Sequence, residues 1–299
     1  MEFSLSKVKH MDNGGIMYGS GKHLKPMMKY LKSKGLPLFL LAIIPSILTS
    51  FIVSPSSMLY FLCDYFKIES FDFTSIYLKL VNFDSEFYYI GIIGVVLYVL
   101  VVAIMFGTVD RHMRVGEFTI NFHRAKARLN YNLLTALKMT CVIVIVFELY
   151  NLLNVGFALL WVGTFVSKPT AFVFSVTIFV ITSFALLVTY SSMLLWPPFM
   201  LHTGLTSVGA FKMGIRQNVG NIIRVGGVML VPIIPIFVLM LLNGILGWGN
   251  LVRILLDGIC LAILAVTYIV LMYTVFYDVT GTERLDLQNK NIWSRNKGV

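Results

Sequence analysis

The stretch YYIGIIGVVLYVLVVAIMFG (Tyr88–Gly107) contains no charged side chain. It exceeds the roughly 18 apolar residues that a helix needs to cross a bilayer. The whole chain has the same character, because 58% of its 299 residues are hydrophobic and only 13% are charged, with a mean hydropathy of +0.83. A soluble domain carries about 25% charged residues. We therefore expect a polytopic membrane protein.

Five further apolar runs have a comparable length and are separated by charged or turn-forming segments. Together they predict an all-α bundle with six transmembrane helices, at Leu36–Val53, Tyr88–Gly107, Met139–Val162, Ala171–Trp196, Val225–Leu246 and Leu251–Phe276. An even number of crossings places both termini on one side of the membrane.

The distribution of basic residues predicts which side that is. Residues 1–35, 108–138, 197–224 and 276–299 hold 20 of the 24 Lys and Arg residues. Basic loops stay in the cytoplasm, so both termini are expected there. The chain then divides into a basic cytoplasmic N-terminal segment (1–35), a six-helix membrane domain (36–276) and a cytoplasmic tail (277–299).

A short motif recurs ahead of the odd-numbered crossings. ALKM (Ala136–Met139) precedes the third crossing, AFKM (Ala210–Met213) the fifth, and KPMMKYLKSKG (Lys25–Gly35) the first. A repeated motif indicates a repeated structural unit. We expect three helical hairpins, each entered through a cytoplasmic amphipathic helix, here called an elbow helix, that lies in the headgroup layer.

Cations on such helices face anionic phospholipid headgroups, each contributing about 1 kcal/mol of attraction. They either anchor the protein in the lipid bilayer or dock a membrane-protein partner. The net charge of +10 needs no nucleic-acid partner to explain it, because the cytoplasmic loops account for it. The candidate headgroup or partner contacts are Arg111, Arg114, Arg124, Arg128, Lys138, Lys212 and Arg216.

The cluster VDRHMRVGEF (Val109–Phe118) ends the second crossing with a high density of charges of both signs. Arg111 and Arg114 either clamp the neighbouring elbow helix or bind a phosphorylated headgroup. We expect Asp110 to accept hydrogen bonds from the N-terminus of an elbow helix, where the helix dipole favours an anion.

Two stretches resemble a known kind of protein. SSMLLWPPFMLHTGLTSVGAFKMGIRQNVGNIIRVGGVML (Ser191–Leu230) and VLMYTVFYDVTGTERLDL (Val270–Leu287) resemble uncharacterised six-helix bacterial membrane proteins. Those proteins are related to the membrane domain fused to some glycerophosphodiester phosphodiesterases. The resemblance implies a six-helix bundle in a bacterial plasma membrane. It does not imply phosphodiesterase activity, because the catalytic domain is absent.

Glu148 is the one acidic residue in the apolar body of crossings two to five. An ionised carboxylate at that depth costs at least about 2.5 kcal/mol, so it should face the bundle interior or stay protonated. Asn151 and Asn154 follow at positions i+3 and i+6 and are expected on a shared polar stripe. This stripe is either a proton or cation relay or an interhelical hydrogen-bonding contact.

Arg253 and Asp257 are four residues apart near the outer end of the last crossing, where they can pair along one helix face. They form either a structural pair or a substrate contact. Prolines interrupt two of the crossings. Pro232 and Pro235 are expected to kink the fifth helix, and Pro45 the first, because proline removes a backbone hydrogen bond.

No P-loop, GxSxG or HExxH motif is present, and the histidines and cysteines lack metal-ligand spacing. We therefore expect no cofactor, no metal and no enzymatic activity. The sequence favours a non-enzymatic scaffold or accessory subunit that contacts anionic lipid and protein partners. The alternative is a small-molecule or ion transporter with its polar site around Glu148.

Overall fold

The computed structural model describes residues 21–68, 72–80, 87–118, 120, 122–164 and 167–287, and within these ranges every regular element is helical. The α-helices, in chain order, are α1 (Gly21–Tyr30), α2 (Leu36–Thr49), α3 (Ser57–Asp64), α4 (Phe73–Leu80), α5 (Tyr88–Val115), α6 (Phe122–Thr164), α7 (Lys168–Met193), α8 (Trp196–Thr203), α9 (Ser207–Asn218), α10 (Ile222–Leu230), α11 (Ile234–Leu246) and α12 (Asn250–Thr280).

Five helical segments are long and apolar enough to cross a membrane, and a bent pair provides a sixth if it counts as one span. The five are His23–Thr49, Tyr88–Val115, Asn130–Thr164, Lys168–Thr203 and Asn250–Thr280. The predicted all-α class is confirmed, and these segments are consistent with a multi-pass membrane protein.

The first candidate span begins well before the predicted start at Leu36. A π-helical turn at Leu31–Gly35 joins α1 to α2, so the helix runs on through the lysine-rich stretch. Lysine is a good helix former, and a hydropathy pattern reports only the apolar part of a helix. The helix also continues through Pro45 without a break, contrary to the kink expected there.

The bent span carries its break at the predicted prolines. The helix Ser207–Leu230 and α11 meet at an angle of 53° across residues 231–233, which include Pro232. Pro235 lies in the first turn of α11, where its missing N–H costs no intrahelical hydrogen bond. The two prolines therefore end one helix and start the next.

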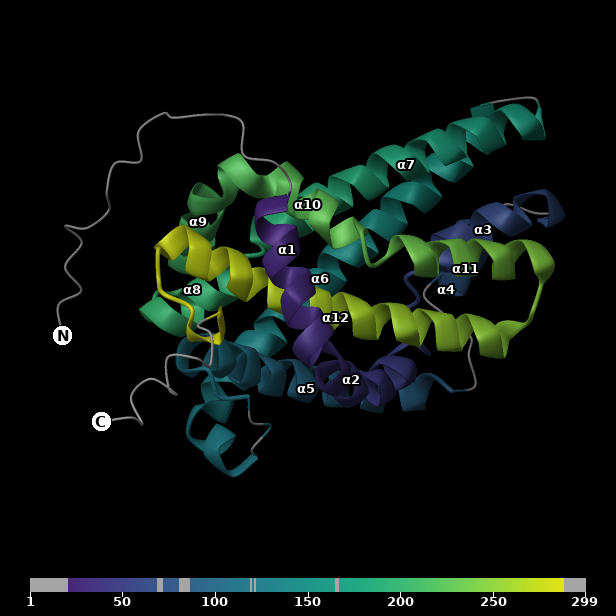
Figure 1. The fold of residues 1–299 in the computed structure, drawn as a ribbon. Coiled ribbons are helices and arrows are strands. Elements are labelled where there is room, and N and C mark those ends of the chain that lie inside the picture. Colours follow the sequence, from purple (N-terminus) through teal and green to yellow (C-terminus); the bar gives the residue numbers. More distant parts are fainter. Residues whose placement is uncertain are drawn as a thin grey trace, which may run out of the picture.

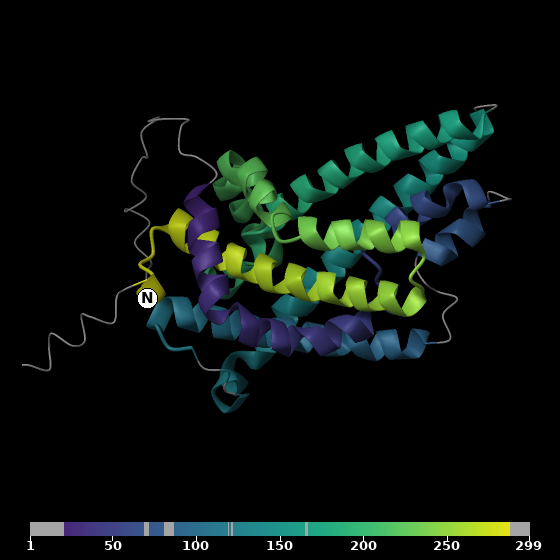
Figure 2. The same ribbon diagram turned by 45° about the vertical axis from the view of Figure 1, so that its right-hand side comes forward.

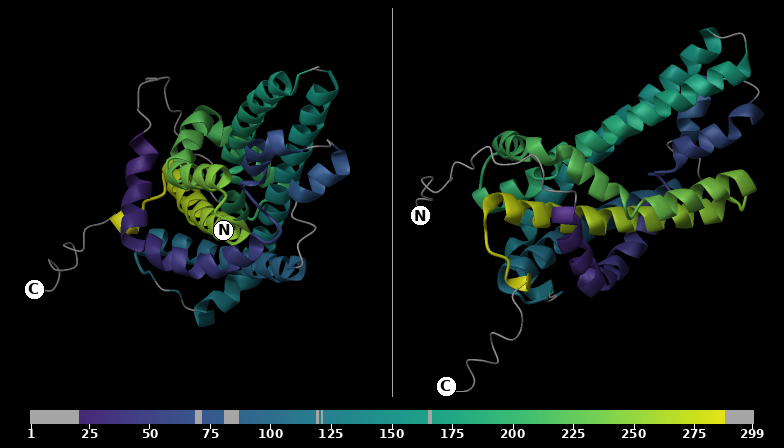
Figure 3. Two further views of the ribbon diagram at one scale, coloured as in Figure 1. Left: turned by 90° about the vertical axis from the view of Figure 1, so that its right-hand side faces the viewer. Right: turned by 45° about the horizontal axis from the view of Figure 1, so that its top comes forward.

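Two helix pairs form arms that diverge toward one end of the molecule (Figure 1). The first arm is α6 with α7, and the second is α11 with α12, which also packs against α2 and α5. Figure 3 shows the same divergence in two further views. The short helices α3 and α4 lie between the arms, where α4 contacts α6 and α3 contacts α11.

Glycines allow α2 to approach its neighbours closely. A Cβ atom added at Gly94 of α5 would lie 2.4 Å from the backbone of α2, and one added at Gly258 of α12 would lie 2.7 Å from the Cα atom of Ile47. Small residues of this kind bring helix backbones together in membrane bundles. Here they hold α5 and α12 on either side of α2.

The remaining elements gather at the end opposite the open arms. We call this the basic end; it comprises α1, α8, α9 and the C-terminal ends of α5 and α12. Figure 2 shows α1 crossing the C-terminal part of α12 there. The buried core is also concentrated toward this end, since α12 is buried without interruption from Ala265 to Tyr277.

Candidate functional site

Glu148 lies near the middle of its candidate span in α6, and its half-buried carboxylate accepts a hydrogen bond from the Tyr77 hydroxyl of α4 at 3.2 Å. Lys138 precedes it by about 15 Å and Trp161 follows by about 20 Å, at 1.5 Å per residue. The carboxylate therefore lies near the centre of a length that matches a bilayer core of about 30 Å. Within the described residues, no ion pair reaches Glu148.

Asn151 follows one turn later on the same face of α6. Its side chain is buried, with 1% of the residue exposed, and neither its amide nitrogen nor its amide oxygen has a hydrogen-bond partner. The amide lies close enough to the Glu148 carboxylate to interact electrostatically, but no hydrogen bond of ordinary geometry joins the two groups. An unpaired buried polar group costs about 1–3 kcal/mol.

Asn154 has a different role from the one the shared stripe predicted. Its Nδ2 donates to the carbonyl of Tyr150 at 2.8 Å, and its Oδ1 accepts from the hydroxyl of Thr182 in α7 at 2.9 Å. The hydroxyls of Tyr150 and Ser183 meet at 3.0 Å beside it. Asn154 thus belongs to the hydrogen-bonded contact between α6 and α7, whereas Glu148 faces α4.

The predicted pair Arg253 and Asp257 forms a third, separate arrangement. Asp257 is 1% exposed and accepts from the Ser54 hydroxyl at 2.6 Å and the Ser56 N–H at 3.2 Å. The Arg253 Nε lies 3.9 Å from this carboxylate, and its guanidinium lies 4.6 Å from the centre of the Tyr60 ring. We call these residues the Asp257 cluster. It ties the α2–α3 connection to α12 and, within the described residues, shares no hydrogen bond or ion pair with Glu148.

The cluster extends to α11 through Tyr60. Its hydroxyl accepts a hydrogen bond from the amide of Asn243. Two parts of the chain that are distant in the sequence therefore meet here: the α2–α3 connection with α3, and α11 with α12. The Asp257 carboxylate accepts from two protein donors, which favours a structural role over a substrate contact, although the Arg253 Nε and the Asn243 Oδ1 have no hydrogen-bond partner among the described residues.

Asp110 anchors a polar network at the basic end. This carboxylate is 7% exposed and lies 2.8 Å from the Tyr277 hydroxyl of α12 and 2.9 Å from the His202 Nε2 of α8. Arg114 approaches it at 3.7 Å. The prediction that Asp110 binds the N-terminus of an elbow helix is wrong, because these partners are side chains. His202 and Tyr277 are too far along the sequence for any local pattern to indicate this network.

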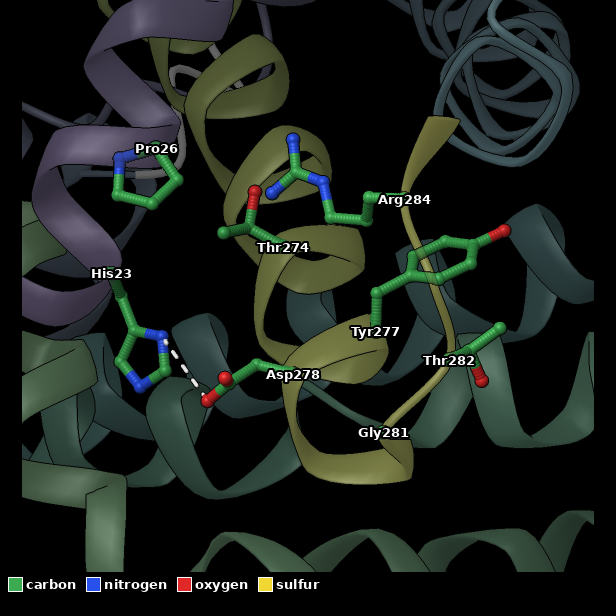
Figure 4. A pocket seen from close by; sticks show the side chains of 8 residues that line it. All are labelled: His23, Pro26, Thr274, Tyr277, Asp278, Gly281, Thr282 and Arg284. Carbon is green, nitrogen blue, oxygen red and sulfur yellow. Dashed lines mark ion pairs between the residues drawn. The ribbon is translucent and has the colours of Figure 1, made fainter. Parts of the chain in front are cut away.

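A cavity of about 320 Å³ opens next to this network, between α1 and the end of α12. Figure 4 shows that His23 points toward Asp278 across it, at 4.0 Å between Nδ1 and Oδ2. Arg284 also lines the cavity, and its guanidinium donates twice to Asp286, at 3.1 and 2.7 Å. Arg284, the arginine that lines the cavity, is therefore already paired with an acidic residue of the protein.

The predicted headgroup contacts divide into paired and exposed cations. Arg111 pairs with Glu117 at 3.0 Å, Arg114 approaches Asp110, and Lys138 donates to the Ser207 hydroxyl at 3.0 Å. Arg111 and Arg114 thus pair with acidic residues of their own segment, and the clamp of an elbow helix stays a prediction. The side chains of Arg124 and Arg128 lie outside the described residues.

Lys212 and Arg216 are both exposed on α9. The buried side of this helix carries Ala210, Gly214 and Asn218, and a Cβ atom at Gly214 would lie 3.1 Å from the backbone at Trp196. Three exposed lysines of α1 and the π-helical turn after it belong to the same end of the molecule: Lys25, Lys29 and Lys32. In the described part of the chain none of these five cations forms an ion pair.

The comparisons with known proteins add no relative. No family model, no curated protein and no solved structure matches this chain. Among the described residues, no group of three or more His, Cys, Asp or Glu side chains is arranged to hold a metal ion. The function must therefore be argued from the geometry of the clusters above.

Proposed function

We propose that this protein is a non-enzymatic scaffold or accessory subunit of a bacterial plasma membrane that binds anionic phospholipid at its basic end. The observation that carries the proposal is the set of exposed cations that form no ion pair with any described residue: Lys25, Lys29, Lys32, Lys212 and Arg216. They come from two parts of the chain far apart in the sequence, namely α1 with the turn after it, and α9. Anionic headgroups are the neighbours that such cations meet at a membrane surface.

The same proposal includes the topology. The basic end lies in the cytoplasm with both termini, and α1, the start of α6 and α9 act as elbow helices for three hairpins. The burial of α9 supports this role, because its small residues pack inward while Lys212 and Arg216 point outward. The plasma membrane follows from the positive-inside rule and from the family resemblance.

The test reverses two charges of α9. At about 1 kcal/mol per cation, Lys212→Glu with Arg216→Glu removes about 2 kcal/mol of attraction to anionic lipid. This corresponds to roughly thirtyfold weaker binding. Relative affinity is measured by the quenching of tryptophan fluorescence with brominated phosphatidylglycerol against brominated phosphatidylcholine in reconstituted vesicles.

The matched control reverses two cations at the other end of the molecule. Lys67 pairs with Asp64 at 2.7 Å, and Lys168 donates to the Ile68 carbonyl at 2.7 Å. Lys67→Glu with Lys168→Glu should leave the preference for phosphatidylglycerol unchanged. Equal preference in all three proteins would refute lipid binding by α9. Loss of a co-purifying membrane protein instead would indicate that α9 docks a partner.

Transport is the second candidate function, and the unpaired Asn151 beside Glu148 favours it. Broken helices line the sites of many transporters, and the break at Pro232 provides one in this bundle. Flux into liposomes that hold the pure protein, lost in Glu148→Gln, would support this function. Absence of flux for a range of ions and small solutes would count against it.

A further inference from the structure

Glu148 and Asn151 bring two kinds of oxygen to one place inside α6. One is a carboxylate with no basic partner among the described residues, and the other is a buried amide oxygen with no hydrogen-bond donor. The Tyr77 hydroxyl of α4 adds a third oxygen, 3.2 Å from the carboxylate. Carboxylate, amide carbonyl and hydroxyl oxygens are the hard ligands that alkali and alkaline-earth cations prefer.

The surroundings of Glu148 define the charge that a ligand must bring. Among the described residues, the titratable side chains that interact with the carboxylate are the tyrosines Tyr77 of α4 and Tyr190 of α7. These are neutral at ordinary pH, so the carboxylate contributes one uncompensated negative charge. A single positive charge would balance it, whereas a divalent cation would leave a net positive charge in apolar surroundings.

Asn151 favours a metal cation over a proton at this place. A proton on Glu148 removes the charge and adds one donor, which can serve only one acceptor, whereas both the carboxylate and the Asn151 amide oxygen are available as ligands. A cation accepts several oxygen ligands at once and can use the carboxylate and the amide oxygen together. It therefore accounts for both the unpaired charge and the unpaired amide.

We infer that Glu148, Asn151 and Tyr77 form a binding site for one monovalent metal cation between α4 and α6. This site is distinct from the lipid-binding surface at the basic end. A cation can be bound at this site without crossing the membrane, so the site is compatible with a scaffold as well as with a transporter. Protons compete for the same carboxylate, and cation binding weakens as the pH falls.

The experiment measures binding of radioactive sodium to the purified full-length protein in nanodiscs at pH 8, with choline as the inert cation and potassium as competitor. Wild type should bind one sodium or be occupied by potassium in its place. Glu148→Gln should abolish binding, and Asn151→Ala should weaken it at least tenfold. Tyr77→Phe, which keeps the ring and removes the hydroxyl, should weaken it severalfold. Lowering the pH to 5 should weaken wild-type binding at least tenfold.

Glu117→Gln is the matched control, because it removes a carboxylate that is exposed and paired with Arg111. It should bind sodium as wild type does. If Glu148→Gln fails to fold, Asn151→Ala and Tyr77→Phe carry the test. No binding of sodium or potassium above choline, or equal binding in wild type and Asn151→Ala, would overturn the inference. A response to pH without any response to the metal cations would show that Glu148 only binds a proton.

The double reversal Lys212→Glu with Arg216→Glu separates this inference from the proposed function. It should leave sodium binding intact while lipid preference falls. Either result can fail without the other, because the two sets of residues share no contact.

Discussion

Replacement of Asp257 by alanine tests the polar cluster that joins α12 to the α2–α3 connection. The carboxylate is buried and receives the Ser54 hydroxyl at 2.6 Å and the Ser56 N–H at 3.2 Å. Asp257→Ala removes the acceptor of both donors. It also leaves the Arg253 guanidinium, whose side chain is 21% exposed, without the carboxylate 3.9 Å away.

The expected cost follows from these contacts. A hydrogen bond to a charged group contributes about 1.5–3 kcal/mol, and breaking a buried ion pair by removing one partner costs about 3–5 kcal/mol. The desolvation of the carboxylate is relieved at the same time, so the terms do not add. We expect Asp257→Ala to lower the free energy of unfolding by about 3–4 kcal/mol. Ser54→Ala, which removes one donor, should cost about 1–1.5 kcal/mol.

The measurement is an equilibrium unfolding titration with SDS in mixed micelles, followed by tryptophan fluorescence. Asp64→Ala is the control, because Asp64 forms a solvent-exposed pair with Lys67, and such pairs contribute little to stability. Removing both charges, in Arg253→Met with Asp257→Leu, should recover much of the loss, since no unpaired charge then remains. A loss no larger than that of Asp64→Ala would refute this account of the cluster.

Five further substitutions are expected to separate packing from polar contacts in the same titration. Gly94→Ala should cost about 2–3 kcal/mol because its Cβ would meet the backbone of α2, whereas Gly156→Ala, with open space around it, should be neutral or slightly stabilising. Tyr277→Phe should lower the free energy of unfolding by about 1.5 kcal/mol. Asp110→Ala should lower it clearly more, because it leaves several partners of the carboxylate without an acceptor. Equal losses for the two variants would contradict the network. Asn151→Leu should raise the free energy of unfolding by about 1–2 kcal/mol when choline dodecyl sulfate replaces SDS and no alkali cation is present, because it removes an unpaired buried amide, and a loss would show that the amide is paired.

The sequence predicted the helical segments well because a membrane leaves few alternatives. Backbone groups without water must form hydrogen bonds within the segment, so a long apolar run such as Tyr88–Gly107 becomes a helix whatever its neighbours do. The break at Pro232 was also predictable, since proline acts on its own backbone. Pro45 shows the limit of that argument, because α2 continues through it.

The polar clusters were predictable only where their members lie on one helix. Glu148 and Asn151 were expected together because residues three positions apart on an α-helix lie on the same face. Arg253 was expected beside Asp257 because residues four positions apart do so as well. Asn154 was assigned to the Glu148 stripe, but its hydrogen bond to Thr182 turns it toward α7. A position at i+6 lies far enough around the helix for tertiary contacts to decide its partner.

The sequence by itself determined the fold class and the ends of most spans, because composition and backbone chemistry act locally. It also determined which residues are too polar for an apolar helix and therefore need partners. Only the tertiary structure decided who those partners are: Ser54 and Ser56 for Asp257, His202 and Tyr277 for Asp110, and Tyr77 for Glu148. These contacts join segments that are far apart in the chain. They depend on how the helices pack against one another, and no local pattern in the sequence indicates that packing.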